Sequence, residues 1–474
     1  MIFTSFSFLT FFVGVFALYW TVRNKSARLG ILLAASALFY GWWDWRFLAL
    51  ISLVIVVSWW VALAMARRPN DRLHQNRWLT FGIVVALSVL GVFKYTGFFA
   101  DSFAQMLAMS GLKADMPTLR IILPVGVSFY VFQAISYMAD VRRRQLPAEP
   151  RLARVALYIA FFPQLVAGPI VRAASFFPQM ERTKRLSRRV VVVGLRAFVT
   201  GLVYKALLAD NIGPLVDQVY GDLDGYGNGA VVVASFAFAA QIYFDFAGYS
   251  LMAIGIARLF GYHIPRNFNF PYAATSITGF WRRWHMSLSF WLRDYLFIPL
   301  GGSRGGKWLY FRNLTATMVL GGLWHGAAWT FVLWGLLHGT ALIVHKLWLE
   351  YGAPIRARFA LLPRAFGWFA GFVLTQYVVL LSWSLFRAQS LPEGLSAMGA
   401  ITGLRTGGAL GVSSALMLVL VPLILDHVLG VTRWRPNWPA LARPEVWWGM
   451  AGMATALALT IYPLKAAPFV YFQF

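Results

Sequence analysis

Histidine is the side chain in this sequence best suited to proton transfer, and His325 has the most unusual setting. It lies in Gly-Gly-Leu-Trp-His-Gly, inside an apolar segment that is long enough to enter a membrane. An ionisable side chain at such a depth is costly, so His325 is a functional-site candidate, with the adjacent Trp324 as a supporting residue. An imidazole with a reference pKa of about 6.5 suits a general base that takes a hydroxyl proton during acyl transfer. The alternative is a structural hydrogen bond to a carbonyl on another helix.

A second histidine lies in a predicted amphipathic helix over residues 281–295. At about 100° per residue, one polar stripe forms opposite a face of tryptophans and leucines. The stripe could line a wet passage, with His285 as a second catalytic group, or it could be a basic anchor at the membrane interface. Its members are Arg282, His285, Ser289 and Arg293.

Residues 298–307 are predicted to form a loop, because Pro299 and four glycines cannot sustain a helix. The segment matches GxxxxGK, but Trp308 stands where a P-loop needs Ser or Thr, and no strand precedes it, which excludes a P-loop. Basic residues in or next to this loop, and those on the polar stripe, could instead hold the phosphates of a cytoplasmic donor. The alternative is a basic loop beside the membrane that binds no donor. The donor-binding candidates are Arg282, Arg293, Arg304, Lys307 and Arg312.

Two further sets of residues have alternative interpretations. Asp245 and Tyr243, in the apolar QIYFDFAGY, could orient a histidine or hydrogen-bond within the helix bundle. His338 and His345 are seven residues apart and share a helix face, but no carboxylate joins them. We therefore predict no metal site, and we expect His338 to pack structurally.

Composition places these residues in a polytopic membrane protein. Of 474 residues, 59% are hydrophobic and only 12% are charged, which is too little polar surface for a soluble protein. The net charge of +25 could suggest nucleic acid, but the cations cluster between apolar runs, as in cytoplasmic loops facing anionic lipid. We predict membrane lipid as a partner and no nucleic acid. The absence of cysteine excludes a cysteine acyl-enzyme and thiolate metal sites.

The basic clusters alternate with apolar runs and predict a topology. The first run, residues 3–20, reads as a retained span with its N-terminus outside. Residues 156–170 contain two prolines and a glycine between basic flanks, which favours a re-entrant segment. The predicted spans include 29–40, 48–65, 78–99, 121–138, 230–260, 367–386, 413–429 and 447–461. The loop with Asp210, Asp217, Asp222 and Asp224 is predicted to lie outside.

We therefore predict an all-α integral membrane protein with about 11 transmembrane helices plus re-entrant and interfacial helices. It is treated as one membrane domain, 1–474, without internal repeats or a soluble domain. Within it, 1–145 holds the N-terminal helices, 150–345 the catalytic core with the re-entrant segment, and 360–474 the C-terminal helices.

A series of motifs resembles the membrane-bound O-acyltransferase (MBOAT) superfamily, specifically the bacterial alginate O-acetyltransferases and their exopolysaccharide relatives. The motifs run along the chain in order: LPVGVSFYVFQAISYMADVRRR, FFPQLVAGPIVR, ADNIGPLVD, QIYFDFAGYS, PRNFNFPYAATSITGFWRRWHMSLSFWLRDYLFIPLGG, RNLTATMVLGGLWHGAAWTFVLWGLLHG and the terminal PFVYFQF. The D-alanyl transferases of teichoic acid are similar but shorter at the C-terminal end. Two positions depart from the pattern. Leu251 stands where relatives usually have Asp, and Arg142 where an aromatic residue is common.

The resemblance implies helices around a central tunnel, with His325 as the catalytic histidine and His285 as the second polar residue beside it. It implies acetyl-CoA or another acyl thioester as donor substrate, with no bound cofactor. A periplasmic partner with a serine nucleophile would pass the acetyl group to a polysaccharide such as alginate. The location implied is the bacterial inner membrane, multi-pass, with a periplasmic N-terminus. Direct transfer and a non-cysteine acyl intermediate both stay open.

Three alternatives compete with this hypothesis. One is transfer of D-alanyl or another acyl group to a cell-envelope polymer. A second is a transporter or flippase of an envelope precursor, in which intramembrane His and Asp and glycine-broken helices also occur, although no inverted repeat is visible. The third is a non-catalytic scaffold for polysaccharide export, which does not explain why an ionisable residue, His325, lies inside an apolar segment.

Overall fold

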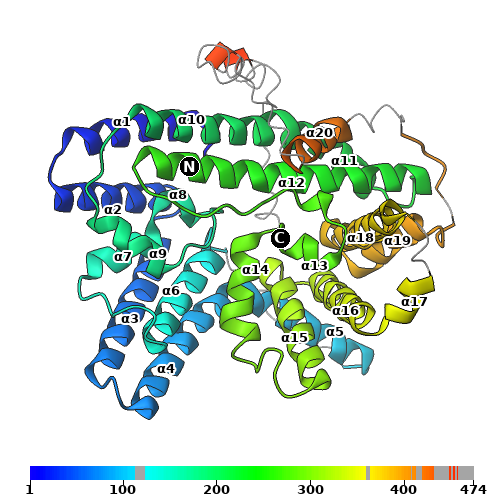
Figure 1. The fold of residues 1–474 in the computed structure, drawn as a ribbon, viewed down its shortest axis with the longest axis horizontal. Coiled ribbons are helices and arrows are strands. Elements are labelled where there is room, and N and C mark those ends of the chain that lie inside the picture. Colours follow the sequence, from blue (N-terminus) through cyan, green and yellow to red (C-terminus); the bar gives the residue numbers. More distant parts are fainter. Residues whose placement is uncertain are drawn as a thin grey trace. The chain divides into compact units, whose positions relative to one another are not determined.

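The computed structural model describes residues 1–112, 123–358, 363–406, 408–412 and 419–431, with 448–449, 452–453 and 456 beyond them. The secondary structure of this part of the chain is helical, apart from one isolated bridge between Tyr226 and Leu410 (Figure 1). This agrees with the predicted all-α class. The predicted span 447–461 lies largely outside the described residues, as do the starts of 121–138 and 413–429.

The chain divides into two compact units, and the first comprises Met1–Thr200 and Tyr249–Pro265. Its apolar helices pack through large aromatic side chains such as Phe8, Phe39 and Phe162, which are each fully buried. The helices are α1 (Phe6–Thr21), α2 (Lys25–Gly41), α3 (Phe47–Arg67), α4 (Arg72–Leu90), η1 (Gly91–Tyr95), α5 (Thr96–Met109), α6 (Val127–Arg142), α7 (Leu152–Ala160), α8 (Phe162–Leu165), α9 (Ala173–Glu181) and most of α10 (Arg188–Leu202).

The second unit comprises Gly201–Gly248 and Arg266–Phe474 and contains both candidate catalytic histidines. Its core is rich in aromatic residues, with Trp284, Trp334 and Trp383 almost completely buried. Its helices are η2 (Val203–Ala209), α11 (Asp210–Tyr220), most of α12 (Asn228–Leu259), η3 (Pro271–Ala273), α13 (Ile277–Trp281), α14 (Met286–Leu292), η4 (Arg293–Phe297), α15 (Lys307–His325), α16 (Trp329–Tyr351), α17 (Ala353–Arg358), α18 (Arg364–Arg387), α19 (Leu391–Thr402) and α20 (Leu420–Val431).

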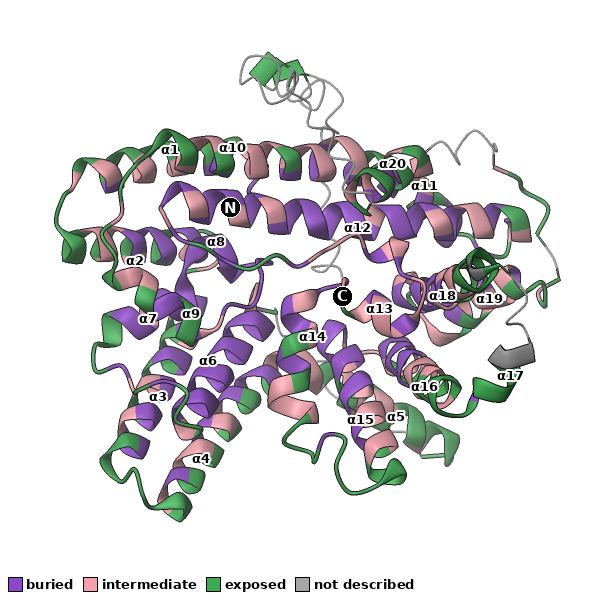
Figure 2. Cartoon of the chain, viewed as in Figure 1, coloured by how far each residue is buried: buried purple, intermediate pink, exposed green. Residues whose placement is uncertain are grey.

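Six helical segments in the described residues are long and apolar enough to cross a membrane, so the chain is a multi-pass membrane protein. They are 47–67, 72–109, 188–220, 228–259, 329–351 and 365–387. Helices α1 and α20 are also apolar but shorter than a full span. The segment 228–259 differs from the others because 78% of its most apolar stretch is buried inside the protein (Figure 2). Most of the surface of helix α12 is therefore covered by protein rather than by lipid.

The segment predicted to be re-entrant is a broken, buried helix. Helix α7 ends before Phe161, whose backbone leaves the helical region, and Pro163 lies in the first turn of α8. A Cβ atom on Gly168 would lie 2.4 Å from the Cα of Gln164, so only glycine fits there. The Gln164 side-chain amide donates to the Tyr158 carbonyl at 2.6 Å. The segment therefore packs as short pieces and does not form a membrane-length helix.

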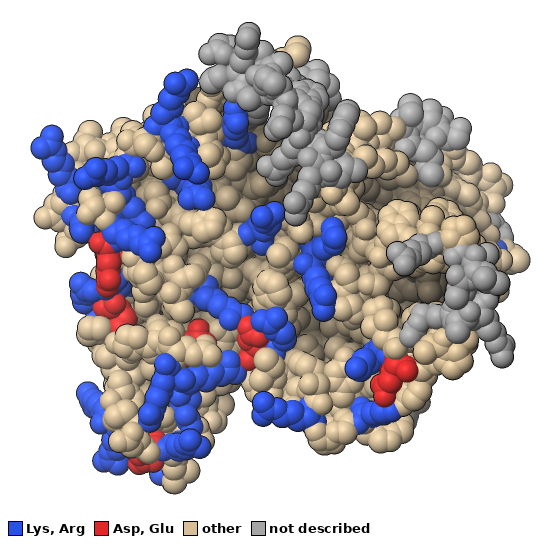
Figure 3. Space-filling view, in the orientation of Figure 1, with Lys and Arg blue, Asp and Glu red and all other residues tan. Residues whose placement is uncertain are grey.

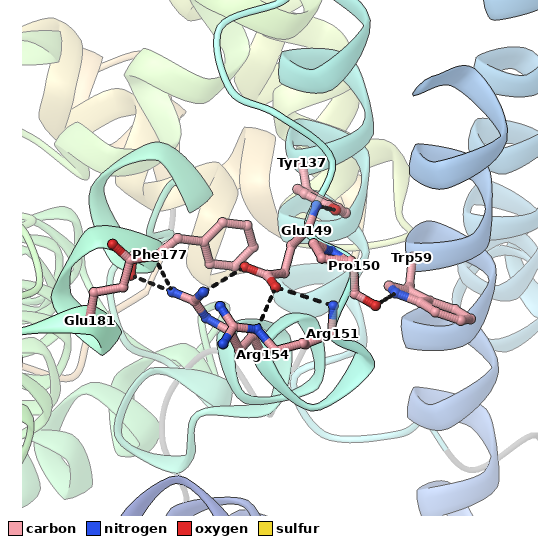
Figure 4. A network of polar contacts seen from close by, with 8 residues as sticks. All are labelled: Trp59, Tyr137, Glu149, Pro150, Arg151, Arg154, Phe177 and Glu181. Atoms are coloured by element: carbon pink, nitrogen blue, oxygen red, sulfur yellow. Dashed lines mark hydrogen bonds and ion pairs between the residues drawn. The ribbon is translucent and has the colours of Figure 1, made fainter. Parts of the chain in front are cut away.

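An ion-pair network centred on the buried Arg154 and Glu149 stabilises the connection between α6 and α7 (Figure 4). Arg154, which is only 5% exposed, bonds Glu149 at 2.9 Å and Glu181 at 3.1 Å. Glu149 also accepts from Arg151 at 3.0 Å, and its backbone N–H donates to the Tyr137 hydroxyl. Arg154, one of the basic residues that flank the segment 156–170, is therefore a structural cation inside the first unit.

Candidate active site

Helices α15 and α16 form a tight hairpin that carries His325 at its turn. A Cβ atom on Gly322 would lie 2.1 Å from the Phe331 carbonyl oxygen, and one on Gly335 would lie 2.4 Å from the Met318 oxygen. The two helices thus touch through their backbones, as small residues permit in membrane helix pairs. Because His325 is the last residue of α15, this contact fixes where its imidazole lies.

The imidazole of His325 is enclosed by aromatic rings. It is 3% exposed, and its ring centroid lies 5.0 Å from Trp324, 5.1 Å from Trp334 and 5.3 Å from Phe386. Phe386 comes from α18, so three helices contribute to the enclosure. Trp324 lies directly beside His325, where the sequence predicts a supporting residue.

His285 belongs to the same cluster. It is completely buried, and its ring centroid lies 6.3 Å from that of His325 and 5.8 Å from that of Trp324. Phe246 of α12 packs edge-on against it at 4.6 Å. The structure therefore brings together the two histidines predicted to be catalytic, although 40 positions separate them in the sequence.

The single helix predicted over residues 281–295 is wrong, because the chain breaks at His285. Helix α13 ends at Trp281, α14 starts at Met286, and His285 between them has left-handed backbone angles of φ 40° and ψ 54°. Such angles are costly for a residue other than glycine and mark sites where the surroundings impose a conformation. Asn267 imposes it here: its carbonyl accepts from the Met286 N–H at 2.8 Å, and its side chain accepts from the Ser287 hydroxyl at 2.6 Å.

The break also separates the members of the predicted polar stripe. Arg282 and Arg293 are exposed, whereas His285 turns into the core. Ser289 is partly buried, and its hydroxyl donates to the Trp284 carbonyl at 3.2 Å. Among the stripe residues, His285 has its ring packed near that of His325.

Neither ring nitrogen of His285 hydrogen-bonds to another described residue. Burial lowers the pKa of His285 to about 3, so its imidazole is neutral at physiological pH. A neutral imidazole has one N–H donor and one acceptor. Leaving the donor and the acceptor of a buried imidazole unsatisfied is costly. A substrate group that hydrogen-bonds to His285 would therefore be stabilised there.

His338 and His345 make structural contacts. The Trp281 indole N–H donates to the Nδ1 atom of His338 at 3.3 Å, and the His338 ring lies 4.6 Å from that of Trp334. His345 shares a 2.9 Å hydrogen bond with the Thr278 hydroxyl. His338 is therefore packed in an aromatic cluster, as the sequence analysis expects.

The loop predicted over 298–307 is present, and α15 begins at its end. Four of its glycines have positive φ, which explains why it is not helical. Lys307 pairs with Glu350 at 2.8 Å, while Arg312 donates to the Asn313 side chain at 2.8 Å. The candidate donor-binding cations are all exposed, and on the face drawn in Figure 3 cationic side chains are more frequent than acidic ones.

Asp245 forms a buried ion pair that sequence reasoning misses. Its carboxylate lies 2.5 Å from the Lys205 ammonium, which also lies 2.7 Å from Asp210. Asp210 is 3% exposed and helical, so the prediction that it lies in a loop is wrong. The reason is that Asp210 begins α11, directly after the π-helical turn that contains Lys205. A lysine inside an apolar run, five residues before an aspartate, is the sequence signal that could have revealed the pair.

These features define a class of protein: a polytopic helical membrane protein with a pair of buried histidines inside an aromatic core. The model of the membrane-bound O-acyltransferase family matches residues 40–384, and the chain belongs to this family. It is accordingly an O-acyltransferase, as the sequence motifs predict.

Individual relatives narrow the comparison. The chain is 41% identical to a probable alginate O-acetylase of Azotobacter vinelandii, over 82% of this chain and 76% of the relative. It is 40% identical to a probable alginate O-acetylase of Pseudomonas aeruginosa, over 82% and 73%. It is 35% identical to a peptidoglycan O-acetyltransferase of Helicobacter pylori, over 83% and 77%. The relatives thus include acetyltransferases that act on two different envelope polymers.

Proposed function

We propose that this enzyme takes an acetyl group from a cytoplasmic thioester, acetyl-CoA or a related donor, and passes it across the inner membrane for O-acetylation of an envelope polysaccharide such as alginate. The names of the relatives support acetyl transfer to such polymers. The observation that carries the proposal is the contact between His285 and His325 inside a buried aromatic shell.

The two histidines have complementary tasks in the proposed reaction. The imidazole of His325 accepts the proton of the acceptor hydroxyl while the oxygen of that hydroxyl attacks the thioester carbonyl. The C–O bond forms, the C–S bond breaks, and the leaving sulfur takes up a proton to become a thiol. Neutral His285 donates its N–H to the carbonyl oxygen, where negative charge develops. No cysteine exists to carry the acyl group, so the hydroxyl attacks directly or through a non-cysteine intermediate.

The membrane arrangement follows from charge. The basic loops face the cytoplasm, where an anionic thioester is available, and the N-terminus lies in the periplasm. Only the small acyl group then needs to cross the membrane, because the donor and the acceptor each reach the histidines from their own face through a tunnel. A periplasmic partner with a serine nucleophile receives the acetyl group and transfers it to the polymer.

The exposed cations near α14 and α15 bind the donor phosphates in this proposal. Charge pairing with flexible arginine and lysine side chains requires no preformed P-loop. The existing Lys307–Glu350 pair is exposed and weak, so a phosphate can replace the carboxylate as its partner.

The test uses full-length protein in lipid vesicles, with a radiolabelled acetyl thioester on the cytoplasmic face and a hydroxyl acceptor on the other. We expect thioester cleavage and label transfer by wild type, and loss of both in His325→Ala. The matched control is His345→Ala, since His345 lies on α16 and bonds only to Thr278 among the described residues. Unchanged cleavage by His325→Ala would overturn the assignment. No cleavage by wild type, even with a periplasmic partner, would favour a transporter.

A further inference from the structure

A cluster of charged side chains lies inside the second unit, apart from the histidine pair. Lys205 of η2 lies 2.5 Å from Asp245 of α12 and 2.7 Å from Asp210 of α11. The three side chains are 5%, 1% and 2% exposed, respectively. An intramembrane cluster of ionisable residues is expensive to bury and marks a functional site by default.

The packing of α12 closes this cluster to solvent. A Cβ atom on Gly248 would lie 2.7 Å from the Gly201 carbonyl oxygen and 2.9 Å from the Lys205 amide nitrogen, so the helices meet at their backbones. The nearby hydroxyls of Tyr204 and Tyr243 both donate to another carboxylate, Asp426. They are therefore occupied outside the cluster.

The charges within the cluster do not balance. Counting these three groups alone, two carboxylates share one ammonium, which gives the trio a net charge of −1 in a low-dielectric interior. The Oδ2 atom of Asp210 is fully buried and accepts no hydrogen bond from any described residue. A buried carboxylate oxygen without a donor is strongly unfavourable in its charged form. When two carboxylates share a site, one of them tends to hold a proton.

We propose that Lys205, Asp210 and Asp245 form a proton-binding site, in which the carboxyl pair holds one proton at neutral pH in addition to the protons of the lysine. The ligand is a proton rather than a metal ion because the unpartnered oxygen has no accessible surface for a larger cation or its coordinating waters. Asp245 is followed by Phe246, whose ring contacts His285. The site therefore lies one residue along α12 from the shell of the reaction centre, and it provides a bound proton close to proton-transfer chemistry.

The test is infrared spectroscopy of the full chain at neutral pH, in an ester-free maltoside detergent, with and without ¹³C at the aspartate side-chain carboxyl. A protonated carboxylic acid absorbs at a higher frequency than a carboxylate. We expect one such band in wild type, shifted by the label. Asp210→Asn and Asp245→Asn should each remove it, because either change leaves one carboxylate against one ammonium. The readout involves no acetyl transfer, so it is independent of the proposed function.

The matched control is Asp217→Asn, because Asp217 is 62% exposed and pairs with Arg387. This variant should keep the wild-type band unchanged. The absence of a label-shifted band in wild type would overturn the proposal, and this measurement does not depend on any variant folding. Persistence of the full band in either Asp210→Asn or Asp245→Asn would overturn it as well.

Discussion

The contact between α15 and α16 predicts that Gly335→Ala is damaging. The added Cβ would lie 2.4 Å from the Met318 oxygen and 2.8 Å from the Val319 Cα, and real Cβ contacts are essentially never shorter than 3.0 Å. The difference, 3.0 − 2.4 Å, means that the new Cβ and the Met318 oxygen must move apart by at least 0.6 Å through a shift of one helix against the other. Because both partners are backbone atoms, no side-chain rotation relieves the clash.

The magnitude follows from two opposing effects. Overpacking costs about 1 to 3 kcal/mol, while alanine in place of glycine in a helix returns about 1 kcal/mol. We therefore expect a net loss of up to about 2 kcal/mol. The separation also moves His325, and a misplacement of about 1 Å can slow a reaction by roughly 100-fold, so acyl transfer should fall by roughly 10- to 100-fold.

The control is Gly339→Ala, one helical turn further along α16. There the nearest atom to the new Cβ, the Cα of Thr315, is at 3.4 Å, which is an ordinary contact. This variant should keep wild-type activity and gain up to about 1 kcal/mol. The assay combines thermal unfolding in detergent with acetyl transfer in vesicles. Equal stability and activity of the two variants would refute the idea that the tight hairpin positions His325.

Three further substitutions test other contacts. Arg154→Ala leaves the buried Glu149 carboxylate with the exposed Arg151 as its remaining cation, so thermal or denaturant unfolding should show a loss below the roughly 3 to 5 kcal/mol of a buried charge with no partner, and a neutral result would show that the network is dispensable. Trp281→Phe removes the N–H that donates to His338, which should lower unfolding stability by about 1 kcal/mol; an unchanged midpoint would contradict the bond. Ser287→Ala removes the 2.6 Å hydrogen bond to Asn267 that helps to hold the strained backbone of His285, so acetyl transfer should fall while the fold is retained. Full activity would argue that this hydrogen bond does not position His285.

The sequence by itself determined the helical class and the position of many helices. Hydropathy predicts a span over 230–260, and α12 runs from Asn228 to Leu259; it predicts 367–386, and α18 runs from Arg364 to Arg387. Glycine and proline content predicts the loop over 298–307. These predictions succeed because apolar length and helix-breaking residues act locally. His325 stands out for the same reason, since an ionisable residue inside an apolar run is visible without a structure.

Tertiary structure decided how the chemical groups are brought together. Helical periodicity places His285 on a continuous helix, but contacts with Asn267 break that helix and turn the imidazole toward His325. Asp210 is predicted from the sequence to lie in a loop, yet packing against α12 buries it and Lys205 beside Asp245. The physical reason is the same in each case. Burial and partner choice depend on residues far apart in the chain, and only the packed helices bring those residues within bonding distance.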